Sequence, residues 1–489
     1  MSELCSKPDQ DLFTYTSGRY LYNERLRRAE RHVHFDVPAL KDIAADCVGR
    51  RSVTRMEKLA EGGFSRVFLL TMNDGFEVIA KLPYSLTVPK HFTTESEVAT
   101  LDFLSSKGVP VPRVYAWSSE DGNAVGSEYV IMEKAPGQPL ESRWFSLTQK
   151  ERVRLVTSFV EIERKMFSFA LGSYGSLYYK GRLPSHLQAD LYGPETLDES
   201  GDASRFCIGP ATDYMFWRGK RAQLDLNRGP WSDQHEYLRS VGRREIEWTR
   251  KFGKAQANDF PHNTVLKGEI SPKIYLDLLD KYLSVAPYLL PRDRGNPLNR
   301  STLRHSGFEK PSLPEDYDSL SPEEKIQADE LHRQRMLFYL YMIFNAKDNK
   351  PHLDALRHPI LMPCQHLVDR AGRQWSGNTI TLKGALVRVV NNWDQLSQGT
   401  SCPVHFDADD EEEFLHTEEQ WFTATTLLEH WRSVLDDLGQ DGWVRNESYE
   451  EVVEMNRRLK REWLDEAEDD EDLLCVEKYW PFQDHEELD

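Results

Sequence analysis

Apolar and polar residues alternate between residues 51 and 83, which is the pattern of half-buried β-strands. The stretch RSVTRMEKLAEGGFSRVFLLTMNDGFEVIAKLP predicts a first strand, a glycine-rich turn and an apolar strand over residues 67–70. The hairpin signal Asn-Asp-Gly at residues 73–75 then leads to a third strand that ends at Lys81. Three antiparallel strands in succession predict a twisted sheet, and residues 38–49 before it predict a helix.

A helix and two further strands complete this part of the pattern. The apolar residues of TTESEVATLDFLSSKG recur at helical spacing, and Thr93 or Thr94 is in the position of the N-cap. Residues 111–117 and 128–133 then predict two more strands, and the Pro-Gly pair at 136–137 closes the segment. The predicted order is three strands, one helix, two strands and a hinge-like break.

From residue 146 onward the helical period dominates. Thr148 and Glu151 have the spacing of a capping box, in which two side chains satisfy free N–H groups at the start of a helix. Ser321 and Glu324 repeat that spacing, with proline at the first helical position, and their helix should run to about Asn345. Further helices are predicted from residue 272 and over residues 417–437 and 447–465.

Together these elements predict a two-lobed α+β protein. We expect an N-terminal arm and helix over residues 1–48, a small lobe of five strands and one helix over residues 49–135, and a large, mainly helical lobe over residues 136–465. An irregular insertion at about residues 180–235 should cover a groove, and residues 466–489 should form an acidic, solvated tail. With 489 residues, of which 39% are hydrophobic, the chain can bury more than one core.

Composition excludes several classes of function. The net charge of −19 argues against a general nucleic-acid binder, because phosphate contacts need a surplus of Lys and Arg on the contacting face. The six cysteines are spread singly, so we expect free thiols in a reducing compartment and no structural zinc. No apolar run reaches the roughly 18 residues of a transmembrane helix, so we expect no membrane span.

The N-terminal sequence MSELCSKPDQDLF contains acidic residues and no apolar core. These features argue against a signal peptide and weaken the case for a mitochondrial transit peptide. Five arginines follow between residues 19 and 31, interleaved with Glu24, Glu30 and tyrosines. We therefore expect a packed arm in preference to an import helix, and a cytoplasmic or mitochondrial protein.

The first hairpin carries the residues with the clearest chemical meaning. Gly62 and Gly63 lie between two strands, where the backbone can turn its N–H groups toward phosphate oxygens, although most such turns are only hairpins. Lys81 follows a buried run and needs an anionic partner, which Glu97 on the next helix can supply. Such a lysine, glutamate and glycine turn clamp the phosphates of ATP in kinase-type folds. The alternative is an ordinary surface ion pair beside a hairpin.

Several segments carry a common resemblance, among them KLAEGGFSRVFLLTMNDGFEVIAKLP, TTESEVATLDFL, VPVPRVYAWSS, EYVIMEKAPG, IGPATDYMFW, SLPEDYDSL and NKPHLDAL. Together they resemble the aminoglycoside phosphotransferase-like family of the protein-kinase-like superfamily, in the fungal branch that includes the altered-inheritance-of-mitochondria protein nine group. The resemblance covers most of residues 12–405 and suggests a mitochondrial location.

The resemblance implies ATP and Mg²⁺ as cofactors, and transfer of the γ-phosphoryl group to the hydroxyl of a small molecule that it does not identify. It gives a phosphate-loop role to Gly62, Gly63 and Ser65, the phosphate-lysine role to Lys81, the helix-partner role to Glu97, and the adenine-binding hinge to Glu133, Lys134 and Ala135.

The residues that would perform the transfer are missing from the sequence. The family pattern needs an Asp that orients the acceptor, an Asn five positions later and a second Asp, the last two holding Mg²⁺. The family lead-in LNRSTLRH ends at His305, but Ser306-Gly307 follows where x-Asp is expected, and residues 308–320 contain no Asn. The 15 residues between His305 and Ser321 are about half of what a catalytic loop and a hairpin need. The Mg²⁺ site is therefore incomplete, and no catalytic residue is predicted.

Other segments do not replace the missing loop. His-x-Asp also occurs at residues 34–36 and 405–407, but five positions after each aspartate stand Lys41 and Glu412 in place of Asn. The segment VVNNWDQL, residues 389–396, superficially resembles a magnesium site. Because the family has a late helix there, we expect a structural role.

Three hypotheses follow. The chain is an incomplete copy of an active phosphotransferase, through an incomplete gene model or a splice form; or an ATP-binding pseudokinase that acts through partners; or a structural protein without nucleotide. We favour the first, because a clean excision between intact family segments is typical of a lost exon, whereas pseudoenzymes usually change single catalytic residues. We also expect exposed apolar surface on the helices beside the gap, and an awkward connection near residues 304–316.

Overall fold

The computed structural model describes residues 12–290, 310–357, 360–397 and 399–487. Its strands are β1 (Arg19–Tyr20), β2 (Val53–Glu61), β3 (Ser65–Met72), β4 (Glu77–Pro83), β5 (Val114–Ser118), β6 (Tyr129–Glu133), β7 (Ser176–Tyr179), β8 (Phe206–Gly209) and β9 (Trp443–Val444). Its helices are α1 (Glu24–Glu30), α2 (Val37–Cys47), α3 (Phe92–Ser106), α4 (Gln149–Phe167), α5 (Gln234–Phe252), α6 (His262–Val265), α7 (Pro272–Val285), α8 (Pro322–Asp348), α9 (Lys350–Leu356), α10 (Leu361–Ala371), α11 (Ile380–Asn391), α12 (Trp393–Leu396), α13 (Ala408–Val434), α14 (Tyr449–Asp465) and α15 (Asp470–Tyr479).

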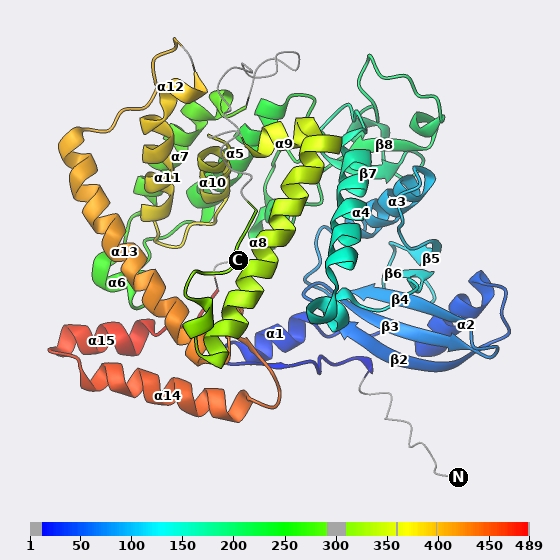
Figure 1. Cartoon of the computed structure of the whole chain (residues 1–489), viewed down its shortest axis with the longest axis horizontal. Helices are drawn as coiled ribbons and strands as arrows, with labels where there is room; N and C mark the ends of the chain where they lie inside the picture. Colours follow the sequence, from blue (N-terminus) through cyan, green and yellow to red (C-terminus); the bar gives the residue numbers. More distant parts are fainter. Residues whose placement is uncertain (1–11, 291–309, 358–359, 398, 488–489) are drawn as a thin grey trace.

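The small lobe is an antiparallel sheet in the order β2-β3-β4-β6-β5, with α3 packed against β5 and β6 (Figure 1). The predicted strands and helix are therefore present in the predicted order. One face of the sheet buries Phe68 and Leu70 against α2 and the residues that precede it. Part of the N-terminal segment thus belongs to the core of the small lobe. The division at residues 48 and 135 stays a prediction.

Three boundaries differ from the sequence prediction. Lys81 lies inside β4, which continues to Pro83. Strand β5 begins at Val114 and not at residue 111, since the prolines before it cannot donate to a ladder. Helix α3 is not capped by a threonine: the N-cap is His91, because the Thr94 hydroxyl donates instead to buried Glu128 at 2.6 Å.

The large lobe has its own core, formed by α5, α7, α10 and α11 (Figure 1). Leu279, Tyr282, Leu367 and Leu386 are fully buried at its centre. These helices alternate apolar and polar faces, so each buries one stripe against its neighbours. The predicted helix from residue 272 is α7, and Ser271 caps it by accepting a hydrogen bond from the N–H of Lys273.

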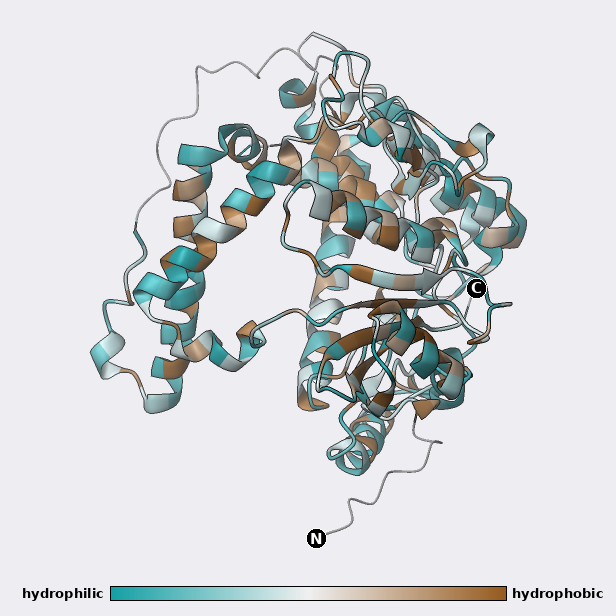
Figure 2. Cartoon of the chain, turned by 90° about the vertical axis from the view of Figure 1, so that its right-hand side faces the viewer, coloured by the Kyte–Doolittle hydropathy of each residue, from teal (hydrophilic) through white to brown (hydrophobic). Residues whose placement is uncertain are grey.

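A second group of helices packs differently. Both predicted capping boxes are present, Thr148 with Glu151 at the start of α4 and Ser321 with Glu324 at the start of α8. Helix α8 packs against α4 and α9. Figure 2 shows apolar residues along this helix pair, at the left of the view. Much of that apolar surface is exposed, as the sequence predicted for helices beside the gap.

The irregular segment at 180–235 consists mainly of turns and short 3₁₀ helices. Its strand β8 pairs with β7, and this ribbon packs on α3 through Leu177, Phe206 and Ile208. That the segment covers a groove stays a prediction. Of the predicted awkward connection near 304–316, residues 304–309 lie outside the described residues, and a single 3₁₀ turn at Tyr317–Ser319 leads into α8.

Segments from the first and last parts of the sequence pair with each other. Strand β1 pairs with β9, so the predicted packed arm is observed. Beyond β9, the start of α15 is acidic and exposed as expected, but Val476, Trp480 and Phe482 are buried against Trp431. Residues 470–482 are therefore a packed helix and its continuation, and not only a solvated tail. Within the described residues, no helix is long and apolar enough to cross a membrane. The cysteines described by the structure are free thiols.

Candidate nucleotide-binding site

The glycine turn joins β2 to β3 at one end of the sheet. Glu61 and Arg66 are the last paired residues before it, and the N–H of Gly62 donates to the carbonyl of Ser65 at 2.9 Å. The N–H of Gly62 is therefore used inside the turn and is not available to a phosphate. Gly63 borders open space, since no atom lies within 4 Å of where a Cβ would be. A ligand can approach the backbone at Gly63.

Lys81 and Glu97 form the contact that the sequence predicted. The Lys81 Nζ atom lies 2.6 Å from Oε1 and 2.7 Å from Oε2 of Glu97. Lys81 is opposite Val67 in the β3–β4 ladder, so its side chain lies on the same face of the sheet as that of Val67. Both charged side chains are about one-third exposed, which leaves the ammonium group accessible to an anionic ligand.

The hinge residues follow β6. The N–H of Glu133 donates to the carbonyl of Arg113 at 2.8 Å, which fixes the end of β6 beside β5. Lys134 and Ala135 are exposed, and the Lys134 Nζ atom lies 2.5 Å from an oxygen of Glu77 on β4. The backbone after Glu133 is thus positioned by the sheet, at the opposite end of β4 from the glycine turn.

That the magnesium site implied by the resemblance is incomplete stays a prediction from the sequence. Among the described residues, no group of three or more His, Cys, Asp and Glu lies close enough to hold a metal ion. The sequence gap after His305 falls at residues 291–309, outside the described part of the chain. Asp36 and Asp407 have structural roles, because each side chain caps a helix by accepting a backbone N–H.

The segment at 389–396 also has the structural role that was expected. It covers the end of α11 and the short helix α12. The Asn392 side chain donates to the carbonyl of Arg388 at 2.8 Å, and Trp393 is buried in the large-lobe core. We derive no catalytic step from this segment.

Sequence reasoning missed the groups behind the glycine turn. Arg66 is fully buried in β3, and its Nε atom donates to Glu61 at 2.8 Å. The signal was present, because Arg66 is a lone charge in the apolar strand SRVFLL, as Lys81 is in the next strand. It also missed that the Phe64 ring, at the tip of the turn, contacts Tyr214 with 5.4 Å between ring centroids. Tyr214 belongs to an irregular segment whose position could not be predicted from local pattern.

Known proteins match the chain over the small lobe and beyond. The model of the phosphotransferase enzyme family APH matches residues 56–191, which include the glycine turn, Lys81, Glu97 and the hinge. A subtelomeric hrmA-associated cluster protein of Aspergillus fumigatus is 29% identical over 88% of this chain and 97% of its own length. The altered inheritance of mitochondria protein 9 of Candida albicans is 24% identical over 81% of this chain and 79% of its own.

Solved structures add little to these matches. The streptomycin–ATP–APH(2")-IIa ternary complex aligns with a TM-score of 0.28 and 12% identity, over 53% of this chain and 59% of that one. That similarity is too low to support an argument about the site.

The sequence alignments are longer than the chain itself. The Aspergillus alignment runs over 513 positions while it covers 88% of a chain of 489 residues, and the Candida alignment runs over 504 positions while it covers 81%. Both relatives therefore carry residues that have no counterpart here. The family model and these relatives support the resemblance of this two-lobed α+β chain to the aminoglycoside phosphotransferase-like family, in the branch that includes the altered inheritance of mitochondria protein 9 group.

Proposed function

We propose that the chain binds ATP between its lobes and derives from a small-molecule phosphotransferase, but lacks the residues that transfer the phosphoryl group. The observation that carries the first part is the contact of Lys81 with Glu97. An ammonium group held by a carboxylate on one side can donate to phosphate oxygens on the other. Gly63 at the turn and the backbone of Glu133 to Ala135 complete the proposed nucleotide site.

The second part of the proposal rests on the sequence gap after His305 and on the surface of α8. Residues 336–344 of α8, MLFYLYMIF, are apolar on every side, and a helix of that kind is normally buried all round. Here Met336 is buried, Phe338 is 62% exposed and the other seven residues of the run are partly exposed. In a complete chain, the missing loop and hairpin would cover this helix.

Polar atoms in the same region support that conclusion. Glu163 Oε2 on α4, Asn345 Oδ1 on α8 and Asn349 Nδ2 between α8 and α9 are buried, yet have no hydrogen-bond partner among the described residues. Buried polar groups are rarely left unpaired, because each such group costs about 1–3 kcal/mol. Their lack of partners indicates that α4, α8 and α9 do not pack here as a closed core normally does.

Two further parts of the proposal come from the family alone. The phosphoryl acceptor is the hydroxyl of a small molecule, and ATP acts with Mg²⁺ in the complete enzyme. The relatives named mitochondrial favour the mitochondrion over the cytoplasm for this chain as well. Cell fractionation of the tagged full chain tests the location.

The alternatives differ in the fate of the missing segment. An incomplete gene model or splice form predicts another transcript that carries it, whereas an ATP-binding pseudokinase predicts that every transcript lacks it. A purely structural protein predicts no nucleotide binding at all. The length of both alignments favours loss of a segment over drift of single residues.

Thermal unfolding with ATP tests nucleotide binding. A ligand at 100 times its Kd stabilises the folded state by about 2.7 kcal/mol, so ATP should raise the Tm of the wild-type chain. Lys81→Met should lose this shift. Lys350→Met is the matched control, because Lys350 also pairs with a carboxylate, Asp354 at 2.7 Å, but lies on α9.

Two outcomes would contradict the proposal. Absence of an ATP shift in the wild-type chain would favour the purely structural hypothesis. Turnover of ATP by the wild-type chain with any hydroxyl acceptor would show that the transfer residues are supplied elsewhere.

A further inference from the structure

The sheet of the small lobe has two faces with different neighbours. Lys81 is opposite Val67 in the β3–β4 ladder, whereas Arg66 is opposite Leu82, so Lys81 and Arg66 point to opposite faces. Glu61 is opposite Arg66 in the β2–β3 ladder and shares its face. The pair Glu61–Arg66 therefore lies behind the proposed nucleotide face, at the base of the turn formed by residues 62–64.

The N-terminal arm, residues 12–20, covers this pair. Glu61 accepts hydrogen bonds from the Thr16 N–H at 2.9 Å, from the Thr16 hydroxyl at 3.1 Å and from the Ser17 hydroxyl at 2.9 Å, all at Oε2. Its Oε1 accepts from Arg66 Nε at 2.8 Å, and the Glu61 side chain is 2% exposed. Arm residues therefore supply most of the donors to this carboxylate.

Arg66 is held by the same part of the chain. Its guanidinium donates to the carbonyl of Leu12 at 2.9 Å and to the carbonyl of Arg31 at 3.2 Å. Burial by itself would raise the pKa of Glu61, but the hydrogen bonds from Thr16 and Ser17 and the charge of Arg66 outweigh it, so the pKa lies below its usual value. The arm thus supplies most of the hydrogen bonds that satisfy this buried ion pair, and Lys58 Nζ, 3.4 Å from Oε1 of Glu61, adds a further cation.

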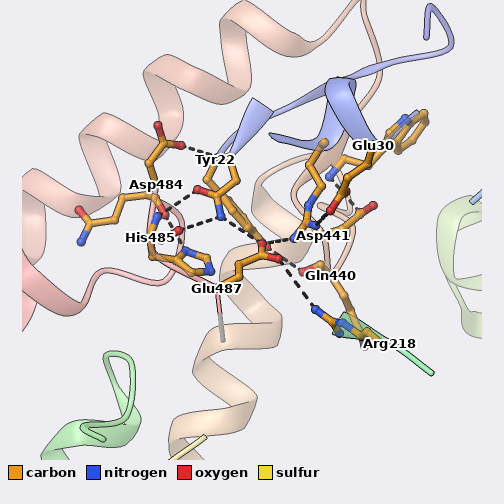
Figure 3. Close-up of polar contacts among 12 residues, drawn as sticks. Tyr22, Glu30, Arg218, Gln440, Asp441, Asp484, His485 and Glu487 are labelled. Carbon is orange, nitrogen blue, oxygen red and sulfur yellow. Dashed lines mark hydrogen bonds and ion pairs between the residues drawn. The ribbon is translucent and has the colours of Figure 1, made fainter. Parts of the chain in front are cut away.

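The far side of the arm is hydrogen-bonded to β9 and to the loops that flank it. The backbone carbonyl of Thr16 accepts a hydrogen bond from the Asn446 side chain at 2.8 Å, and the Tyr15 hydroxyl accepts one from the Trp443 indole at 2.9 Å. Figure 3 shows the continuation of this contact, where the Tyr22 hydroxyl donates to the carbonyl of Gln440 at 2.7 Å. The arm therefore lies between the base of the turn 62–64 and β9, and hydrogen bonds hold it on both sides.

We propose that the N-terminal arm is a positioning element of the nucleotide site: Thr16 and Ser17, by holding Glu61, fix the turn 62–64 where it meets the phosphates. Only three residues separate Glu61 from β3, so a shift of Glu61 moves the backbone at Gly63 directly. The inference rests on the proposed ATP binding. It assigns a role in phosphate binding to residues that lie on the other face of the sheet.

The test compares two ligands on the full chain. The double variant Thr16→Val/Ser17→Ala removes two hydroxyl donors to Glu61 and leaves the backbone donor. Because a hydrogen bond to a charged group is strong, we expect ATP affinity to fall about tenfold or more. Adenosine has no phosphates, so its affinity should stay within about twofold of wild type. Thr16→Ser/Ser17→Thr keeps both hydroxyls and should restore ATP affinity.

Thr54→Val is the matched control. The Thr54 hydroxyl donates to the carbonyl of Thr71 at 3.1 Å, at the other end of the same β2–β3 hairpin. Its loss should leave the affinity for both ligands unchanged. Titrations run well below the Tm of each variant, and Ser17→Ala alone replaces the double variant if that variant does not fold.

The outcomes separate this inference from the proposed function. Wild-type ATP affinity in the folded double variant overturns the inference and leaves ATP binding intact. An equal loss of ATP and adenosine affinity also overturns it, because the arm would then only support the fold. Absence of ATP binding in the wild-type chain overturns the proposed function, and the arm then has no site to position.

Discussion

The small lobe and the α4–α8 helix pair bury their apolar residues to very different extents. Phe68 in β3 is fully buried and contacts the ring of Phe35, with 5.4 Å between ring centroids. Phe338 in α8 is 62% exposed, although it lies in a longer apolar run than Phe68 does. Both segments are strongly apolar in sequence, so composition does not explain the difference.

The difference lies in what covers each segment. The small lobe has its sheet, α2, α3 and the N-terminal arm; β3 lies between β2 and β4, and α2 and the residues before it cover the face that carries Phe68. Helix α8 packs on α4 and α9, and Ile326, Leu331 and Phe338 of α8 are exposed. A sequence that is apolar on all sides encodes a partner on all sides. The exposure of Phe338 in this run is what the proposed loss of a segment after His305 would produce.

The largest effect should come from truncating one phenylalanine in each region. Phe68→Ala should destabilise the chain by about 3–5 kcal/mol, because it leaves a cavity in a closed core. Phe338→Ala should change stability by no more than about 0.5 kcal/mol, as at most surface positions. Urea unfolding of both variants measures the difference. Comparable losses would mean that Phe338 is covered in solution, and the comparison would be wrong.

A smaller loss of stability should appear when the pH is lowered, because a histidine is buried in a well-packed part of the chain. Burial between α6 and α13 lowers the pKa of His262 to about 4 from 6.5. The unfolded chain binds this proton near pH 6.5 and the folded chain near pH 4, so stability should fall as the pH drops through that window. His262→Gln should flatten the pH dependence. The Nε2 atom of His262 lies 2.9 Å from the Thr425 hydroxyl, so Gln preserves a polar partner.

The urea midpoint at pH 7 and pH 5 measures this effect. His416→Gln on the exposed side of α13 is the control, because it removes a histidine without opening a buried contact. An equally steep fall in stability for His262→Gln and wild type would show that this histidine is not the buried group responsible.

Polar substitutions on α8 should give the smallest change in stability. They should, however, measurably weaken self-association of the chain. Ile326 is 70% exposed, and exposed apolar patches promote self-association. The double variant Ile326→Ser/Phe338→Ser should therefore lower association with a stability change below about 0.5 kcal/mol. Light scattering over a concentration series measures it. Leu197 is even more exposed, at 83%, but lies in the irregular segment, so Leu197→Ser should leave association as it is in the wild type.

Local signals in the sequence predicted much of the fold. The capping boxes at Thr148 and Ser321 begin the two helices that they predicted, because both partners lie within one turn. The contact of Lys81 with Glu97 followed from one lysine at the end of an apolar run. A capping box depends only on residues that are close in sequence. The Lys81–Glu97 contact could be predicted because a lone lysine in an apolar strand has few possible partners.

The features that were missed depend on distant partners. The pairing of β1 with β9 joins residues more than 400 positions apart, and no local pattern encodes it. The N-cap of α3 is His91 and not the predicted threonine, because Thr94 binds Glu128, which is distant in sequence. Arg66 could have been found, since it is a lone charge in an apolar strand, but its partners Leu12 and Arg31 use backbone carbonyls that any sequence provides.

The transcript tests the central claim most directly: that a segment has been lost between the family lead-in and the residues that follow it. Full-length cDNA should be sequenced across the codons for Arg304 to Pro311. We predict an isoform with an in-frame insertion after His305 that encodes an Asp, an Asn five positions later and a further Asp. Several independent full-length clones that all run directly from His305 to Ser306, with no other isoform, would contradict the claim.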